Sequence, residues 1–257
     1  KTTSVQALGV AMAERGRKVL LVDLDPQASL TWACGVDPDA LEVSIHDVLL
    51  KRAKVADVLI VLDPPPPLAD GAKAGRPGVV HLLPSTIDLA GAELHLLTKT
   101  GREFVLRKAL AKVADHYDRV LIDCPPSLGI LTINGLTAAD DVLIPLQCES
   151  LSQRGVGQLL ETIDDVRDYT NPDLAVRGAI ATLFDGRTRL AHDVVAQVRE
   201  QYDITVFEPF VPKSVKVAEA PAHGRSVLTH APRSKSAQAY RDLAAQLLAP
   251  PRKGRRS

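Results

Sequence analysis

The sequence predicts an α/β protein built on a mostly parallel, twisted sheet with helices on both faces. Short unbroken runs of Val, Leu and Ile alternate along the chain with longer segments of helical periodicity. This alternation is typical of strand–helix–strand units, and strands that are apolar along their whole length are buried on both faces. We therefore expect one domain over residues 1–257, with a basic tail from about 250 to 257.

The first predicted pair is a helix over residues 4–16, with Val5, Leu8 and Met12 on one face, followed by a strand over 18–23. Helix–strand pairs recur through the rest of the chain, and a final helix over 236–248 closes it. The predicted helices are about 103–117, a segment after Thr132, and 152–169; the strands that follow them are 119–123, 141–146 and 175–184.

One stretch breaks the alternation. Residues 63–78 hold five Pro and three Gly, which disfavour both helix and strand interiors. We expect an irregular excursion there, outside the core.

Composition restricts the class of protein. Hydrophobic residues make up 46% and charged residues 24%, which is ordinary for a soluble globular chain. Cys34, Cys124 and Cys148 are too widely spaced for a disulfide framework or a Cys-x-x-Cys knuckle, and we interpret them as small hydrophobic residues in a reducing compartment. No apolar run approaches the roughly 18 residues of a membrane span.

Charge is balanced overall but not along the chain. Residues 213–257 carry ten basic and two acidic side chains, a net charge of +8, so residues 1–212 carry −8. This asymmetry indicates a polyanionic partner for the basic segment. For Arg252, Lys253, Arg255 and Arg256 alone, a solvated tail is the plainer interpretation.

Acidic residues end two of the apolar strands. Asp23 and Asp25 follow one strand and Asp123 ends another, where open α/β sheets bind ligands; a single Asp at a strand end can equally just begin a turn. Lys1 and Thr2 match the last two positions of the phosphate-loop pattern G-x-x-x-x-G-K-[ST], and they open the first helix, whose N-terminus favours phosphate. Asp123 would then supply the second contact to a magnesium ion.

These features occur within longer stretches that resemble the ParA-type partitioning ATPases, a branch of the deviant Walker-A family. The stretches are KTT, RKVLLVDLDPQASLT, LLPSTIDLAGAEL, YDRVLIDCPPSLGILTINGLTAADDVLIPLQCES, RTRL and VPKSVKVAEAPAHGRSVLTHAPRSKSAQAYRDLA. Family members read K-G-G-V-G-K-T-T where this sequence begins with its last three residues. The resemblance implies a further strand before Lys1, beside the strand that ends at Asp123. We expect a gap or an unpaired sheet edge there, and weak ATP binding by a chain that starts at Lys1.

The resemblance also implies roles for individual residues. Lys1 corresponds to the lysine on the β- and γ-phosphates, Thr2 to the Mg²⁺ ligand and Thr3 to an α-phosphate contact. Asp25 corresponds to the aspartate that positions the attacking water, and Asp123 to the Walker B aspartate that holds Mg²⁺ through water.

Three further positions receive roles in the same way. The family folds a loop over the adenine near Pro212 and Lys213, so the resemblance assigns these two residues to base contact. Asp23, the other strand-end carboxylate, is interpreted as structural.

The implied function is ATP-driven partitioning of chromosome or plasmid copies. An ATP-bound homodimer would bind duplex DNA without sequence preference and leave it when a ParB-type centromere-binding protein stimulates hydrolysis, in the cytoplasm on the nucleoid. The basic residues nearest the adenine loop are the candidate DNA contacts: Lys213, Lys216 and Arg225. The two arginines of RTRL, Arg187 and Arg189, are weaker candidates.

Two alternatives remain. A MinD-like regulator acting at a membrane would need an apolar amphipathic C-terminal helix, and LLAPPRKGRRS is interrupted by two Pro and continues without apolar residues. An iron–sulfur reductase would need cysteines placed to bridge two subunits around a cluster.

Overall fold

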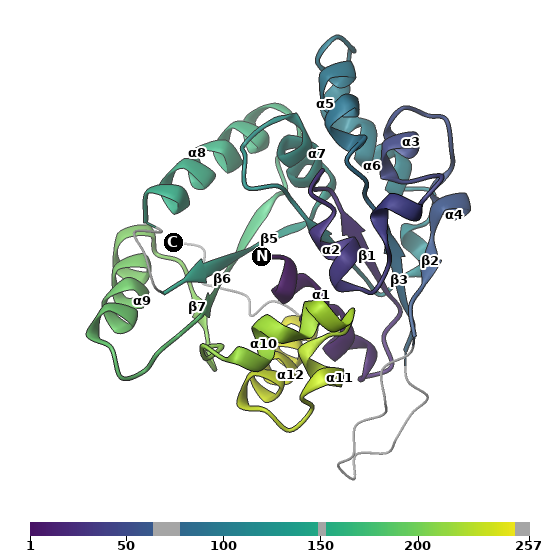
Figure 1. Cartoon of the computed structure of the whole chain (residues 1–257). Helices are drawn as coiled ribbons and strands as arrows, with labels where there is room; N and C mark the ends of the chain where they lie inside the picture. The colour runs from purple at the N-terminus through teal and green to yellow at the C-terminus, as the bar shows by residue number, and fades with distance from the viewer. Residues whose placement is uncertain (64–77, 149–152, 250–257) are drawn as a thin grey trace.

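The computed structural model describes residues 1–63, 78–148 and 153–249, and confirms the α/β class. Most of the expected Pro- and Gly-rich excursion and the basic tail lie outside these residues, so both stay predictions. The strands form two sheets, which Figure 1 shows on the right and on the left of the molecule.

The first sheet has the order β2-β3-β1-β4 and the second the order β5-β6-β7. All neighbouring strands are parallel except β2 and β3, which are antiparallel. The strands are β1 Val19–Asp23, β2 Ile60–Val61, β3 Val80–Leu83, β4 Arg119–Asp123, β5 Asp141–Gln147, β6 Ala175–Thr182 and β7 Val206–Phe207.

Helices cover both faces of the first sheet (Figure 1). One face is covered by α1 (Thr2–Ala13), α11 (Val227–His230) and α12 (Lys235–Leu248). The other is covered by α3 (Ile45–Leu49), α4 (Val55–Val58), α5 (Leu89–Leu97), α6 (Val105–Leu110) and α7 (Ile130–Ala138). The second sheet packs against α8 (Gln153–Tyr169) and α9 (Arg189–Tyr202). Two further short helices are α2 (Ser29–Ala33) and α10 (Val215–Glu219). The 3₁₀ turns are Pro38–Ala40, Arg102–Phe104, Ala114–His116 and Ala220–His223.

Strand β1 shows why its sequence is apolar throughout. Successive side chains of a strand point to opposite faces, so Val19 and Leu21 enter the core under α1 and α12, while Leu20 and Val22 enter the core under α3 to α7. Every residue of β1 is buried. The strand therefore joins the two cores and places Asp23 at its carboxyl end.

The two sheets are separated where the sequence predicts an unpaired edge. Within the described residues, β4 pairs only with β1, and β5 pairs only with β6. The first four residues of β4 are consequently exposed or half-buried, although three of them are apolar. The expected unpaired edge beside Asp123 is confirmed.

The predicted helix over 103–117 is wrong in extent. Regular α-helix covers only Val105–Leu110, between the 3₁₀ turns at Arg102–Phe104 and Ala114–His116. Asn134 of α7 explains the start, because its side-chain oxygen accepts the Leu106 amide at 3.1 Å and its Nδ2 donates to the Arg102 carbonyl at 2.8 Å. This contact from a distant element is invisible in the local pattern.

Other boundaries shift slightly. Helix α7 begins at Ile130, ahead of the predicted start after Thr132, and β6 ends at Thr182 while Phe184 forms only an isolated bridge with Pro212. The predicted helix from 152 is described from Gln153, and one stripe of its side chains, Val156, Ile163 and Val166, is buried.

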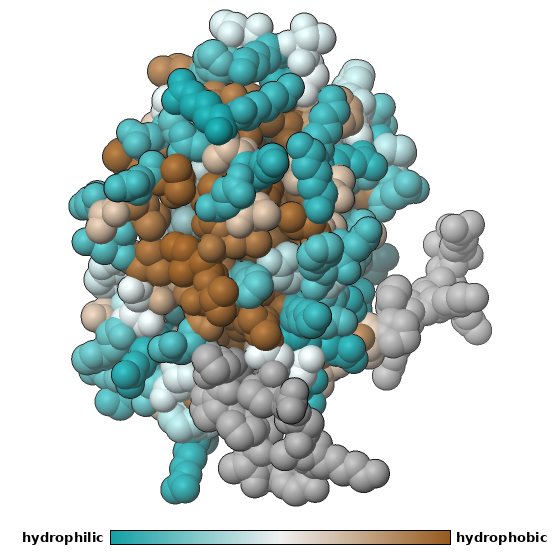
Figure 2. Space-filling view, turned by 90° about the vertical axis from the view of Figure 1, so that its right-hand side faces the viewer, coloured by the Kyte–Doolittle hydropathy of each residue, from teal (hydrophilic) through white to brown (hydrophobic). Residues whose placement is uncertain are grey.

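The side of the molecule that carries β2 has an apolar patch on its surface (Figure 2). Val61 of this two-residue edge strand is 68% exposed.

In the described part of the chain, no helix combines the length and apolar character that crossing a bilayer requires.

Candidate nucleotide site

The start of α1 brings the predicted phosphate residues to the end of β4. Lys1 caps the helix, and its Nζ donates to the Cys124 carbonyl at 3.2 Å. The Thr2 side chain lies close enough to the Asp123 carboxylate to oppose the rise in its pKa. A lysine, a hydroxyl and a carboxylate that are distant in sequence thus meet at a helix N-terminus, which favours anionic ligands.

Asp23 and Asp123 lie side by side at the ends of β1 and β4, in direct register. The Asp23 carboxylate accepts the Thr31 amide and hydroxyl, both at 2.8 Å, and the Asp25 amide at 3.2 Å. Burial raises the pKa of Asp23 to about 6, and these hydrogen bonds oppose the rise. Both oxygens of Asp23 are committed to the fold, which supports its structural interpretation.

Asp123 is equally buried but is not satisfied. Among the described residues, its Oδ2 is the buried side-chain oxygen without a hydrogen-bond partner. Burial raises the pKa of the Asp123 carboxyl, against the Thr2 hydrogen bond and the positive charge of Lys1. A buried, unpaired carboxylate oxygen beside a threonine hydroxyl is a donor set that suits a hard divalent cation such as Mg²⁺.

Asp25 lies on the loop that follows β1 and is half-buried. Its backbone carbonyl accepts the Ser85 hydroxyl at 2.8 Å, and its side chain accepts the Gln27 amide at 2.9 Å. The Ser85 amide in turn donates to the Thr31 hydroxyl at 2.9 Å. The end of β3 thereby holds the loop, and the charge of Asp25 contributes to the raised pKa of Asp123.

A pocket of about 430 Å³ adjoins the start of α1. Thr2 and Thr3 line it on one side and Pro221 on another, and the remaining wall comes from α2 and the residues just before it: Gln27, Ser29, Trp32 and Ala33. Its volume lies in the range of small-molecule sites.

Pro212 and Lys213 lie beyond the end of β6. Pro212 bridges to Phe184, and the Lys213 amide donates to the Phe184 carbonyl at 3.1 Å. Neither residue lines the pocket beside Thr3. Their assignment to base contact stays a prediction.

The candidate DNA contacts occupy two neighbouring segments. Lys213, Lys216 and Arg225 are exposed on the segment around α10, and Lys213 lies close enough to Asp185 to lower the pKa of that carboxyl. Lys216 pairs with Glu219 at 3.0 Å. For the guanidinium of Arg225, the described residues provide no partner.

The two weaker candidates are engaged by carboxylates on their own segment. Arg187 forms two hydrogen bonds with Asp185, at 2.9 and 2.8 Å, and Arg189 lies 3.7 Å from Asp193. Their positive charges are therefore partly neutralised in this state.

The cysteines lie in apolar surroundings. Burial raises the pKa of Cys34 and Cys124 to about 12 and that of Cys148 to about 11, so the thiolate form is disfavoured at neutral pH. This environment supports the small-hydrophobe interpretation. In the described part of the chain, no group of three or more His, Cys, Asp or Glu side chains could hold a metal.

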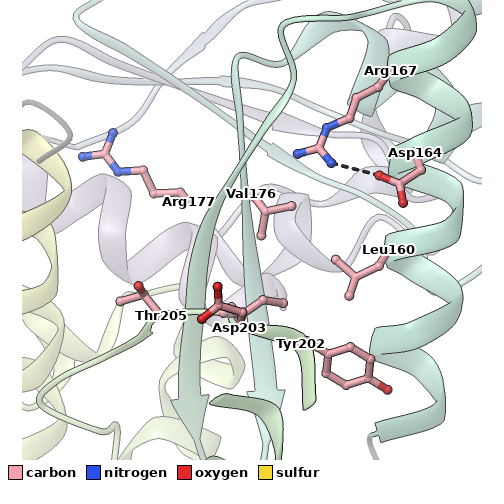
Figure 3. A pocket seen from close by; sticks show the side chains of 9 residues that line it. Leu160, Asp164, Arg167, Val176, Arg177, Tyr202, Asp203 and Thr205 are labelled. Atoms are coloured by element: carbon pink, nitrogen blue, oxygen red, sulfur yellow. Dashed lines mark hydrogen bonds and ion pairs between the residues drawn. The ribbon is translucent and has the colours of Figure 1, made fainter. Parts of the chain in front are cut away.

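A second pocket, of about 310 Å³, lies in the second sheet region, between α8, the start of β6 and the loop before β7 (Figure 3). Its two arginines are already engaged. Arg167 donates to Asp164 at 2.9 Å and to the Leu174 carbonyl at 2.8 Å, and Arg177 pairs with Asp141 at 3.2 Å. We therefore place the candidate site at the start of α1.

Sequence reasoning gave no role to several residues of the site. Thr31 holds the Asp23 carboxylate, Ser85 holds the backbone carbonyl of Asp25, and Trp32 and Pro221 line the pocket. Ser85 lies in LLPSTIDLAGAEL, one of the stretches that carries the family resemblance, so a signal for it was present.

The chain is similar to several known proteins. Residues 1–176 match the family model described as "AAA domain". The chain is 39% identical to the sporulation initiation inhibitor protein Soj of Bacillus subtilis, over 97% of this chain and 93% of that protein. It is 40% identical to the chromosome partitioning protein ParA of Myxococcus xanthus, over 96% and 83%.

A solved structure is also similar. The crystal structure of cobyrinic acid a,c-diamide synthase from Mycobacterium smegmatis is 47% identical, covers 96% of this chain and 89% of its own, and superposes with a TM-score of 0.82. That protein has also been solved with a bound ATP analog and magnesium.

Proposed function

The chain belongs to the ParA/Soj family of chromosome-partitioning ATPases, and on this premise we propose that it is an ATP- and Mg²⁺-dependent DNA-segregation switch. Its ATP-bound homodimer binds duplex DNA without sequence preference, and a ParB-type partner releases it by stimulating hydrolysis. The switch acts in the cytoplasm on the nucleoid, on chromosome or plasmid copies. The observation that carries the proposal is the Lys1, Thr2 and Asp123 constellation, with its unpaired buried oxygen.

Each residue of the site has a chemical task. Lys1 and the first amides of α1 hold the β- and γ-phosphates, and Thr3 contacts the α-phosphate. Thr2 would hold Mg²⁺ directly, and Asp123 would hold it through water. When bound, the ion neutralises phosphate charge and orients the phosphates.

Asp25 orients the attacking water. Its backbone is held by Ser85, so the carboxylate is carried on an anchored loop. On the described loop, Asp25 is the one carboxylate assigned to orient the water. Basal hydrolysis is therefore slow, and a partner is needed to accelerate it.

The mutational test separates binding from hydrolysis. In the full-length protein, Asp25→Ala should abolish ATP hydrolysis and preserve ATP binding and dimerisation, while Lys1→Ala should lose nucleotide binding itself. Asp57→Ala, an exposed carboxylate on α4, serves as the control. Hydrolysis by Asp25→Ala at the parental rate would contradict the assigned role.

DNA binding is assigned to the basic segment. Lys213 and Lys216 flank the start of α10. If they contact phosphates, the logarithm of the DNA affinity should fall linearly with the logarithm of the salt concentration, with a slope of roughly −0.9 for each phosphate neutralised. Lys213→Glu with Lys216→Glu should remove ATP-dependent DNA binding and retain dimerisation. The charge-matched control is Lys54→Glu with Lys112→Glu, and deleting residues 252–257 should have a smaller effect.

Three results would count against this site. Binding that ignores nucleotide would remove the switch, binding that ignores salt would exclude phosphate contacts, and an unchanged double variant would move the site elsewhere. The membrane alternative receives no support from α12, because its apolar side chains Tyr240, Leu243 and Leu247 are buried in the core under α1.

A further inference from the structure

The loop that carries Asp25 is held by a closed ring of hydrogen bonds. The Asp25 amide donates to Asp23 Oδ1 at 3.2 Å, and the Asp25 carbonyl accepts the Ser85 hydroxyl at 2.8 Å. The Ser85 amide donates to the Thr31 hydroxyl at 2.9 Å, and that hydroxyl donates to Asp23 Oδ2 at 2.8 Å. The bonds that start at Asp23 therefore return to it through three other residues.

Three members of this hydrogen-bond ring are fully buried, and the fourth reaches the site. Asp23, Thr31 and Ser85 are shielded from solvent, whereas Asp25 is half-buried. The buried members come from the end of β1, from α2 and from the segment just after β3. Hydrogen bonds shielded from water strengthen one another, so the ring links three distant elements rigidly to the loop of Asp25.

The ring fixes Asp25 through its backbone. Both backbone polar groups of Asp25 are occupied, its amide by Asp23 and its carbonyl by Ser85. The Gln27 amide then holds Asp25 Oδ1 at 2.9 Å from within the same loop. A carboxylate that orients an attacking water must be held to within about 0.5 Å of its productive position. The ring supplies the support for such a placement.

We propose that Ser85 and Thr31 are positioning residues for ATP hydrolysis, which act through the backbone of Asp25. Both are fully buried, so neither can itself contact the nucleotide or the water. The proposal rests on the proposed role of Asp25 and deepens it. The ring makes the rate of hydrolysis depend on the end of β3, while the phosphate contacts at the start of α1 do not involve it.

The test measures ATP hydrolysis and ATP affinity separately in the full-length protein. Ser85→Ala removes the bond to the Asp25 carbonyl and keeps the Ser85 amide. Its kcat should fall roughly tenfold, the scale of one lost hydrogen bond, while the Kd for ATP with Mg²⁺ stays unchanged. Thr31→Val opens the ring between Ser85 and Asp23 and should lower kcat similarly. Thr31→Ser retains the hydroxyl and should restore most of the rate.

Ser44→Ala is the matched control for loss of a buried hydroxyl. Ser44 is buried, and its hydroxyl pairs with that of Thr86, the residue after Ser85, at 3.2 Å. It also caps the N-terminus of α3, outside the ring. Ser44→Ala should therefore lower the free energy of unfolding, measured in urea, and leave kcat at the parental value. An equal loss of kcat in this control would overturn the inference, because any buried hydroxyl would then have the same effect.

Hydrogen exchange of the Gln27 amide gives a second readout, because this amide reports on the Asp25 side chain. Exchange should be faster in Ser85→Ala than in the parent and unchanged in Ser44→Ala. If Asp25→Ala is inactive while Ser85→Ala and Thr31→Val keep the parental kcat, this inference alone is overturned. Parental hydrolysis by Asp25→Ala would overturn the proposed role of Asp25 and this inference with it.

Discussion

Strands β1 and β4 have similar sequences, VLLVD and RVLID, and lie in register side by side, yet their surroundings differ. β1 has a neighbour on each side and is buried throughout, whereas β4 is paired on one side among the described residues and only its last residue is buried. Burial of a strand is thus decided by its neighbours, and apolar sequence only makes it possible.

The carboxylates at the two strand ends differ in the same way. Asp23 has three hydrogen-bond donors around it, and Asp123 has an oxygen with none. A buried carboxylate that the fold satisfies stabilises a loop, while one that the fold leaves unsatisfied is available for a ligand. Position at a strand end is common to both, so hydrogen bonding distinguishes the aspartate that the fold satisfies from the candidate ligand-binding one.

The largest effect should come from removing the satisfied carboxylate. Asp23→Ala leaves the Thr31 amide, the Thr31 hydroxyl and the Asp25 amide without their acceptor, and should lower the free energy of unfolding by roughly 3 kcal/mol. Urea denaturation measures this loss. The matched control is Asp123→Ala at the neighbouring strand end, and equal destabilisation by both substitutions would erase the distinction drawn here.

The second effect concerns ligand linkage at Asp123. Asp123→Asn replaces a carboxylate whose pKa is raised by burial with a neutral group, so stability without ligand should be unchanged or higher by about 1 kcal/mol. The parent should gain stability from saturating ATP with Mg²⁺, by an amount set by ligand concentration over Kd. Thermal unfolding should show that this gain is largely lost in Asp123→Asn. A full gain in the variant would remove Asp123 from the metal site.

A smaller effect concerns pH. Because the folded-state pKa of Asp23, about 6, lies above its ordinary value of 3.8, folding favours its protonated form. Its contribution to stability is present below pH 3.8 and is lost as pH rises through 6. Between pH 5 and pH 7 this amounts to about 1 kcal/mol. The difference in unfolding free energy between the parent and Asp23→Asn should shift by that amount across this range, and a constant difference would contradict the raised pKa.

The smallest expected effect is a difference in hydrogen exchange between β1 and β4, measured without any substitution in these 257 residues. Amides of β1 face paired neighbours on both sides, while the β4 amides that do not face β1 have no strand partner among the described residues. Hydrogen exchange should be slowest in β1 and faster at those positions of β4. Uniform protection of β4 would show that something covers its second edge.

The sequence by itself determined the alternation of strands and helices, because a strand between two helical layers must be apolar along its length. It also predicted Lys1, Thr2, Asp25 and Asp123 as candidate site residues, from strand ends, a helix start and the family resemblance. It failed where distant contacts decide, as when Asn134 sets the start of α6.

Only the tertiary structure decided which carboxylate is satisfied and what borders the phosphates. Thr31 and Ser85 reach Asp23 and Asp25 from other elements. Trp32 and Pro221 line one pocket, and Gly35 lies against Gly224 close by in sequence to each of them. Side chains this far apart in sequence share no periodicity that could reveal their pairing. Hydrogen-bond satisfaction and concave shape are properties of the assembled chain, because both depend on which groups folding brings within a few ångströms of one another.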